Sequence, residues 1–295
     1  MMEEKLLGKE AKKEVYDLYS KEDFLPLTLE DGTSTVTVSN SLFTATFNKT
    51  SGTLTNYTYN GVQLITKPLR LNVFRLPTDN DGSKRESWDN MGLRSLTARC
   101  DGCEVEKTDD GKTVSVVLNT RYIGKNSTVF NVQMNFLVCA NGTMMINSFI
   151  KPTATGALLP KIGFRLEMPA EMEQLSWFGR GPWDSYRDRK EACLPVIYKS
   201  TVTDQYEEYI MPQEHGTKQE VRWMSLTNDE GNGLLFVAPG QMAASAVHFR
   251  PEDNYTDRNN RSRHTYEFKK CANTVVSLDA ATRGLGNNSC GPDTT

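Results

Sequence analysis

Hydrophobic and polar residues alternate along most of the chain after residue 33. The alternation is clear at Val36 and Val38, which stand between threonine and serine residues. Further alternating runs occupy residues 42–47, 114–118, 129–138, 144–150, 162–168, 233–238, 243–249 and 274–280. A period of two residues places one set of side chains on one face of a β-strand. The pattern therefore predicts an all-β domain of about a dozen or more strands.

Turn signals separate the alternating runs. They are the pairs Asn60-Gly61, Asp110-Gly111 and Asn141-Gly142, and the segment 230–233. The first pair is the one favoured in a type I′ β-hairpin. Many strands with short connections predict antiparallel sheets, which either close into a barrel or pack face to face.

The first 33 residues differ from the rest. Apolar residues in 1–22 have a ragged helical spacing that Gly8 interrupts. We therefore expect a linker or N-terminal extension over 1–33 and a single β domain over 34–295. The polar, lysine-rich start has no apolar core of a signal peptide, and a bacterial cytoplasmic or periplasmic location stays open.

Charge and metal-ligand spacing exclude several classes of function. The chain has 34 Lys and Arg against 37 Asp and Glu, a net charge of −3. This balance argues against a nucleic-acid partner or a polybasic membrane surface, and no apolar run approaches the ~20 residues of a membrane span. The CxxC pair Cys100 and Cys103 lacks a second ligand pair, and no histidine has zinc spacing, so no metal site is predicted.

Four stretches mix aromatic, amide and charged residues and are interpreted as loops: 74–82, 177–189, 209–216 and 283–292. Loops on a β scaffold commonly carry binding sites. Trp183 with Arg180 and Asp184 nearby suits a carbohydrate, which offers C–H faces to aromatic rings and hydroxyls to charged groups. A structural role for the same residues remains open.

Another prediction concerns the loop at 74–82. Arg75, Asp79 and Asp81 are expected to form a buried or half-buried polar cluster that ties this loop to a sheet.

The same stretches resemble the C-terminal region of lac-type β-galactosidases of glycoside hydrolase family 2. The matching segments are Arg75-Leu-Pro-Thr-Asp-Asn-Asp81, Trp177-Phe-Gly-Arg-Gly-Pro182, Pro212-Gln-Glu-His-Gly216 and Gly284-Leu-Gly-Asn-Asn-Ser-Cys-Gly-Pro292. They occur in order and cover about residues 34–292. The resemblance implies a large antiparallel β-supersandwich, similar to the galactose-mutarotase fold.

In that family this domain follows a TIM barrel that holds the catalytic glutamates. A barrel needs roughly 250 residues, which the first 33 residues cannot supply. The resemblance thus implies a non-catalytic C-terminal domain or small subunit that completes the active-site wall and stabilises the enzyme. Its partners would be the catalytic barrel domain or large subunit and a galactoside, and this chain alone is expected to be inactive.

The resemblance also carries expectations for individual residues. Asn287, Asn288, Cys290, Trp183 and Arg180 are expected to face the barrel or the substrate. Cys290 stands where the best-known members have a tryptophan, so stacking on the sugar is expected from elsewhere. No cofactor is expected in this chain, because the Mg²⁺ and Na⁺ sites of family enzymes lie mostly in the other domains.

Two functions of other classes remain open. The first is an aldose 1-epimerase-like enzyme, which needs a histidine acid and a glutamate base in one cleft. Its candidates are His215 or His264 with Glu214 or Glu220. The second is a free carbohydrate-binding module that uses Trp177, Trp183 and Tyr186.

Overall fold

The computed structural model describes residues 25–82, 84–153, 158–255 and 264–286. Within these ranges the strands form three sheets, in the orders β1-β2-β3-β4-β5, β10-β9-β8-β7 and β13-β12-β14-β15-β16-β11-β6. Every strand pairing in them is antiparallel. The prediction of a large, antiparallel all-β sandwich is confirmed.

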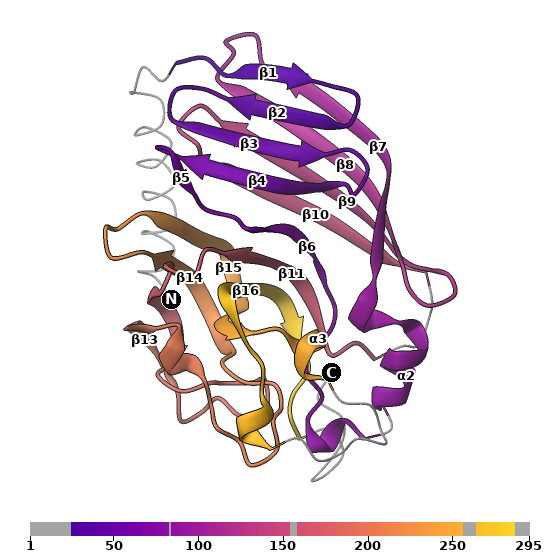
Figure 1. Cartoon of the computed structure of the whole chain (residues 1–295), viewed down its shortest axis with the longest axis vertical. Coiled ribbons are helices and arrows are strands. Elements are labelled where there is room, and N and C mark those ends of the chain that lie inside the picture. The colour runs from indigo at the N-terminus through magenta and orange to yellow at the C-terminus, as the bar shows by residue number, and fades with distance from the viewer. Residues whose placement is uncertain (1–24, 83, 154–157, 256–263, 287–295) are drawn as a thin grey trace, which may run out of the picture.

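The first two sheets pack face to face in the upper half of the molecule (Figure 1). The five-stranded sheet contains β1 Thr28–Asp31, β2 Thr35–Ser39, β3 Phe43–Asn48, β4 Thr53–Tyr59 and β5 Val62–Gln63. The four-stranded sheet contains β7 Thr97–Lys107, β8 Thr113–Ile123, β9 Thr128–Cys139 and β10 Met144–Pro152. The rings of Phe47 and Phe136 meet edge to face between the sheets, with centroids 5.0 Å apart.

The alternation in the sequence accounts for the core of this sandwich. On β8, Val114, Val116 and Leu118 are fully buried, whereas the residues between them are partly exposed. On β9, Phe136 and Val138 face the same interior. Because alternate side chains of a strand point to opposite faces, each strand contributes every second residue to the core.

The seven-stranded sheet fills the lower half of the molecule (Figure 1). It contains β6 Lys67–Asn72, β11 Lys161–Met168, β12 Gln174–Gly181, β13 Leu194–Thr201, β14 Lys218–Thr227, β15 Gly233–Phe249 and β16 Lys270–Thr282. The short helices are η1 Asp79–Asp81, α2 Lys84–Met91, η2 Leu93–Ser95, η3 Thr203–Gln205, α3 Pro251–Asn254 and η4 Thr265–Glu267. None of the described helices is long and apolar enough to cross a membrane.

The turn and strand predictions at two local motifs are confirmed. Asn60 and Gly61, between β4 and β5, both have positive φ angles, 48° and 77°, as a type I′ turn requires. Cys100 and Cys103 lie in β7, opposite Thr120 and Leu118 of β8, and both are free thiols. The CxxC motif is therefore part of an ordinary antiparallel ladder.

Three boundaries differ from those expected. Residues 28–31 form β1, and Leu27 is only 2% exposed, so the β domain begins inside the stretch assigned to an extension. Residues 233–238 and 243–249 belong to one continuous strand, β15. Residues 177–181 belong to β12 and are not a loop. The stretch with ragged helical spacing, residues 1–22, lies outside the described residues.

The glycines of β12 serve close strand packing and not a loop. A Cβ atom on Gly179 would lie 2.9 Å from the Cα of Val221, and one on Gly181 would lie 2.8 Å from the ring of Tyr198. Glycine is needed here because neighbouring strands and rings approach closely.

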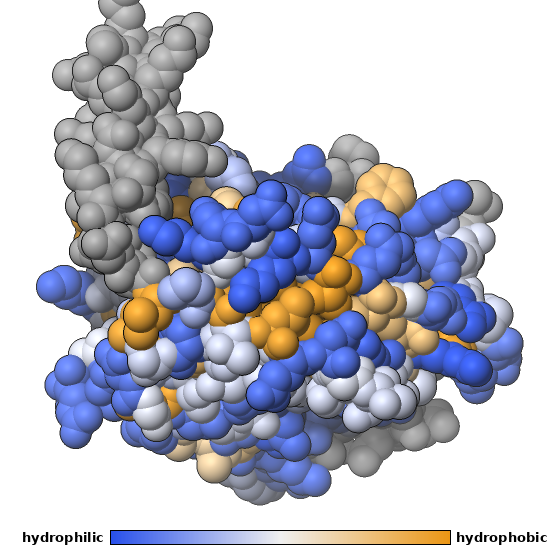
Figure 2. Space-filling model, turned by 90° about the horizontal axis from the view of Figure 1, so that it is seen from above, coloured by the Kyte–Doolittle hydropathy of each residue, from blue (hydrophilic) through white to orange (hydrophobic). Residues whose placement is uncertain are grey.

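The sandwich is open at the end formed by its edge strands β1 and β7. Figure 2 looks onto this end and shows a band of hydrophobic atoms between polar flanks. Leu29 on β1 and Cys103 and Val105 on β7 are only partly buried and pack against the core.

Two glycines with the same φ angle test whether close packing or the φ angle itself sets the stability cost of replacing them by alanine. Gly142 and Gly231 both have φ 85°. A Cβ on Gly142 would lie 2.7 Å from the Tyr59 ring, whereas one on Gly231 would meet nothing within 4 Å. We expect Gly142→Ala to lower the free energy of unfolding by about 1–3 kcal/mol more than Gly231→Ala, in chemical denaturation. Equal losses would contradict the packing at this turn.

Candidate functional site

Loops from distant parts of the chain meet at the lower end of the seven-stranded sheet (Figure 1). We define the loop rim as residues 74–82, 182–193, 206–216 and 283–286. These segments follow β6, connect β12 to β13, precede β14 and follow β16. Hydrogen bonds and ion pairs join the segments to one another, as the next paragraphs describe.

A buried ion pair lies at the centre of the loop rim. Arg75 and Asp81 are 1% and 0% exposed, and the Arg75 Nη2 lies 2.8 Å from Asp81 Oδ1. Arg75 also donates to the backbone carbonyls of Arg283, at 2.8 Å, and Gly284, at 2.9 Å. One guanidinium therefore binds both its own loop and the end of β16.

Asp79 does not belong to this buried pair, contrary to expectation. It is exposed, whereas Asp81 accepts a hydrogen bond from the backbone N–H of Thr78 at 2.9 Å. Both residues lie in the single turn of η1. With three residues per turn, residues two apart on a 3₁₀ helix are separated by about 120° around its axis, so Asp79 and Asp81 point in different directions.

The chain end is held on the loop rim by two further side chains. Asp188 accepts hydrogen bonds from the backbone N–H groups of Leu285, at 2.9 Å, and Gly286, at 2.6 Å. Asn80 donates to the Leu285 carbonyl at 3.0 Å. Burial disfavours the charge of Asp188, but the backbone N–H donors outweigh it and lower the pKa of this carboxyl.

The residues expected to face the barrel at the chain end are not placed by the structure. Asn287, Asn288 and Cys290 lie outside the described residues. In the described part of the family-matching segment 284–292, Gly284 is buried, and Leu285 and Gly286 are partly exposed.

A second polar cluster joins the segments 182–193 and 206–216. Asp184 binds the Arg189 guanidinium and accepts a hydrogen bond from the Tyr209 hydroxyl at 2.8 Å. Arg189 also donates to the Tyr209 oxygen at 2.8 Å. Burial, together with Asp184, raises the pKa of Tyr209 to about 12. Asp184 is only 5% exposed, so it holds the loops together and does not face a carbohydrate at the surface.

Trp183 is the exposed aromatic residue of the loop rim, with 61% of its surface accessible. It lines a surface hollow of about 560 Å³, together with Asp188, Arg189, Glu207 and Tyr209. This volume lies in the range of small-molecule sites, about 300–1,000 Å³. Trp177, by contrast, is 1% exposed and stacks on Tyr198, so it is a core residue and not available to a carbohydrate.

Arg180 supports the loop beside Trp183. It lies in β12, and its Nε is 2.8 Å from Glu220 Oε2, while Lys190 Nζ is 2.6 Å from Glu220 Oε1. Arg180 also donates to the backbone carbonyls of Lys190 and Cys193, at 2.9 and 3.1 Å. Its polar atoms therefore hold the segment 182–193 in place.

A buried lysine fixes the start of the same segment. Lys218 is 4% exposed, donates to the Pro182 carbonyl at 3.0 Å and lies 5.3 Å from the Trp177 ring centre. Burial lowers the pKa of Lys218 to about 8, although Asp184 opposes the shift. The fold thus holds a cation at a large desolvation cost.

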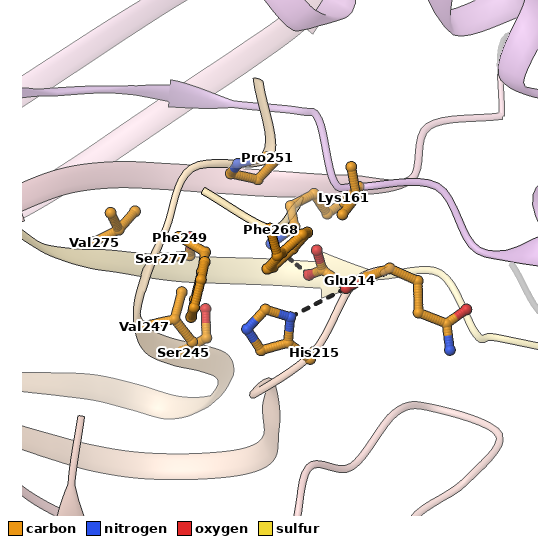
Figure 3. A pocket seen from close by; sticks show the side chains of 12 residues that line it. Lys161, Glu214, His215, Ser245, Val247, Phe249, Pro251, Phe268, Val275 and Ser277 are labelled. Carbon is orange, nitrogen blue, oxygen red and sulfur yellow. Dashed lines mark hydrogen bonds and ion pairs between the residues drawn. The ribbon is translucent and has the colours of Figure 1, made fainter. Parts of the chain in front are cut away.

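A second group of buried charges joins Lys161, Glu214 and Asp279, of which Figure 3 shows the first two. Lys161 Nζ lies 2.9 Å from Asp279 Oδ2 and 3.3 Å from Glu214 Oε1. Burial is the main reason that the pKa of Asp279 rises to about 6. Sequence reasoning missed Lys161, because it begins an ordinary strand and its partners come from two other elements.

The geometry gives no support to an epimerase-type acid–base pair. Next to His215 the structure leaves about 30 Å³, room for one or two water molecules but not for a sugar (Figure 3). His215 Nδ1 faces the Gln213 carbonyl at 3.1 Å, and Glu214 is held by Lys161. The other candidate base, Glu220, is bound by Arg180 and Lys190.

Metal ligands do not cluster in the described part of the chain. No three His, Cys, Asp or Glu side chains there are placed to hold a metal ion.

Antiparallel sandwich sheets that carry a rim of polar and aromatic loops are typical of β domains with a binding or docking surface. The family model described as "Beta galactosidase small chain" matches residues 39–295. The chain therefore belongs to the β-galactosidase small-chain family.

Full-length relatives give the same result. The chain is 30% identical to a β-galactosidase of Priestia megaterium, over 89% of this chain and 25% of that protein. It is 25% identical to one of Actinobacillus pleuropneumoniae, over 88% and 25%, and 26% identical to one of Staphylococcus xylosus, over 85% and 24%. The chain thus spans about a quarter of the length of the relatives it matches.

A solved structure of a putative mutarotase from Salmonella typhimurium is also similar in shape. It covers 95% of this chain and 96% of its own, with a TM-score of 0.38 and 10% identity.

Replacing one partner of the buried Arg75–Asp81 ion pair tests how much the pair contributes to the free energy of unfolding. Arg75→Ala or Asp81→Ala is expected to lower the free energy of unfolding by about 3–5 kcal/mol, because each leaves a buried charge without its partner. Asp79→Ala, in the same helix turn but exposed, is the matched control and should change it by less than about 0.5 kcal/mol. Urea denaturation of the three variants makes the comparison, and equal losses for all three would contradict the buried pair.

The buried lysine predicts a dependence of stability on pH. Between pH 8 and 10.5 the unfolded chain keeps the Lys218 proton and the folded chain releases it, so this group adds stability as pH rises. Lys218→Met should remove that increment, about 2 kcal/mol between pH 7.5 and 9.5, measured as the change between these two pH values in its difference in unfolding free energy from wild type. Lys199→Met, on an exposed position of β13, should follow the wild-type profile. A constant difference at both pH values would contradict the prediction.

Proposed function

We propose that this chain is the C-terminal, non-catalytic domain or small subunit of a β-galactosidase, and that it stabilises the enzyme and completes the wall of its active site. The observation that carries the proposal is the loop rim, where family-matching segments from four parts of the chain meet around an exposed Trp183. The partner is the rest of the β-galactosidase, including a catalytic TIM-barrel domain or large subunit.

The side chains of the loop rim are suited to line one side of a substrate site, but they do not form a complete hydrolytic site. Glycoside hydrolysis uses two carboxyl groups, one of them as acid or base. The carboxylates of Asp81, Asp184 and Asp188 are each bound by a guanidinium or by backbone N–H groups. The Trp183 ring remains open beside the hollow, and a sugar stacks its C–H face on such a ring.

This proposal predicts activity only in the assembled enzyme. The purified chain should give no turnover of nitrophenyl β-D-galactoside. Mixed with a polypeptide that carries the catalytic barrel of the same β-galactosidase, it should raise the activity of that polypeptide. Turnover by this chain alone that a point substitution within it abolishes would overturn the proposal, and so would a barrel polypeptide that neither binds the chain nor gains activity.

A substitution at Trp183 tests whether the loop rim contacts the substrate in the assembled enzyme. Trp183→Ala in the assembled enzyme should raise KM for the galactoside about 2–10-fold, because an aromatic contact contributes about 0.5–1.5 kcal/mol. Ile210→Ala is the control, since Ile210 is 98% exposed on the neighbouring rim segment. An unchanged KM would remove Trp183 from the substrate wall. Millimolar galactose binding by the isolated chain, lost in Trp183→Ala, would instead favour a free carbohydrate-binding module.

A further inference from the structure

A second hollow of about 430 Å³ lies away from the loop rim, between the upper sandwich and the edge of the seven-stranded sheet. Its walls come from the start of β4, from β6, β7 and β11, and from Arg250 after β15. Figure 1 shows β6 and β11 side by side in this part of the molecule. The cations that line it are Lys67, Arg70, Arg165 and Arg250.

The strand register places two of these cations against each other. Arg70 on β6 is the direct cross-strand partner of Arg165 on β11. Like charges opposite each other on neighbouring strands are destabilising. Both guanidiniums bind the same oxygen of Glu252, the Arg70 Nη2 at a distance of 3.3 Å. One carboxylate oxygen therefore serves two arginines.

Glu167 is the acid that lines the hollow itself, and its carboxylate already has several donors. Glu167 accepts hydrogen bonds from Arg250, at 2.6 and 2.7 Å, and from the Asn273 amide at 2.7 Å. Arg250 also lies 3.4 Å from Asp253 Oδ2. The carboxylates around the hollow thus compensate Arg250 more fully than they compensate Arg70 and Arg165.

Two buried polar atoms at this place lack partners. Arg165 is only 3% exposed, and its Nη1 has no hydrogen-bond acceptor among the described residues. Glu252 Oε2 has no donor there either. A buried polar atom without a partner costs about 1–3 kcal/mol, and more for charged groups. Hydrogenphosphate offers both an acceptor for a guanidinium and a hydroxyl for a carboxylate.

We propose that this hollow is a phosphate-binding site, in which Arg70 and Arg165 hold the phosphate oxygens and Lys67 adds a further positive charge. The ligand is inorganic phosphate or the phosphate group of a small metabolite. The site is separate from the loop rim and does not depend on the function proposed for the rim. Burial is the main reason that the pKa of Arg70 is lowered, and the neighbouring Arg165 lowers it further.

Calorimetric titration of the full chain tests the site, at an ionic strength held constant with sodium chloride. Inorganic phosphate should bind saturably, and Arg70→Met should weaken it about tenfold or more, because a hydrogen bond to a charged group is lost. Arg70 has half of its side chain exposed, so this variant is expected to fold, and circular dichroism checks it. Arg99→Met, on an exposed position of β7 outside the hollow, is the matched control and should bind as wild type does.

Further ligands distinguish the sources of the phosphate group. Glucose 6-phosphate that binds more tightly than inorganic phosphate would indicate a phosphorylated metabolite, and the reverse order would indicate free phosphate. Glucose should not bind at this site. The proposal is overturned if neither phosphate ligand binds, if succinate binds as tightly as phosphate, or if Arg70→Met leaves the affinity unchanged.

Discussion

The ion pair between Arg75 and Asp81 is the interaction on which the loop rim depends. It is buried, and its guanidinium also binds the backbone carbonyls of Arg283 and Gly284. Only arginine among the side chains offers five donors in one plane, enough for a carboxylate and two carbonyls together. The end of the seven-stranded sheet is thereby joined to the loop after β6. The backbone N–H groups of Leu285 and Gly286 donate to Asp188 and so hold residues 283–286 against the loop 182–193 as well.

Most charges of the rim serve to hold its shape. Asp184 is occupied by Arg189 and Tyr209, and Glu220 by Arg180 and Lys190. Loops fixed in this way keep a surface preorganised for a partner, since little conformational freedom remains to be lost on binding. In contrast to these engaged side chains, Trp183 is exposed and lies beside a hollow of about 560 Å³. This combination supports the function proposed for the loop rim.

The hollow at the loop rim and the hollow beside β6 and β11 differ in chemistry for a structural reason. The rim hollow lies among loops, where Trp183 stays free of the core. The second hollow lies against paired strands, where the β6–β11 register sets Arg70 against Arg165. The first suits a neutral ring, and the second suits an anion.

The sequence by itself determined many of the strands, their turns and the family. The two-residue period at Val114, Val116 and Leu118 and the pair Asn60-Gly61 are local signals, and the structure follows them. Glycines were ambiguous, because a glycine serves a loop and a close strand contact equally well, and β12 was therefore misread. Only the tertiary structure decided which charges meet, as between Lys161 and Asp279. Such pairs depend on strand register and on which strands become neighbours, and neither is encoded in local spacing.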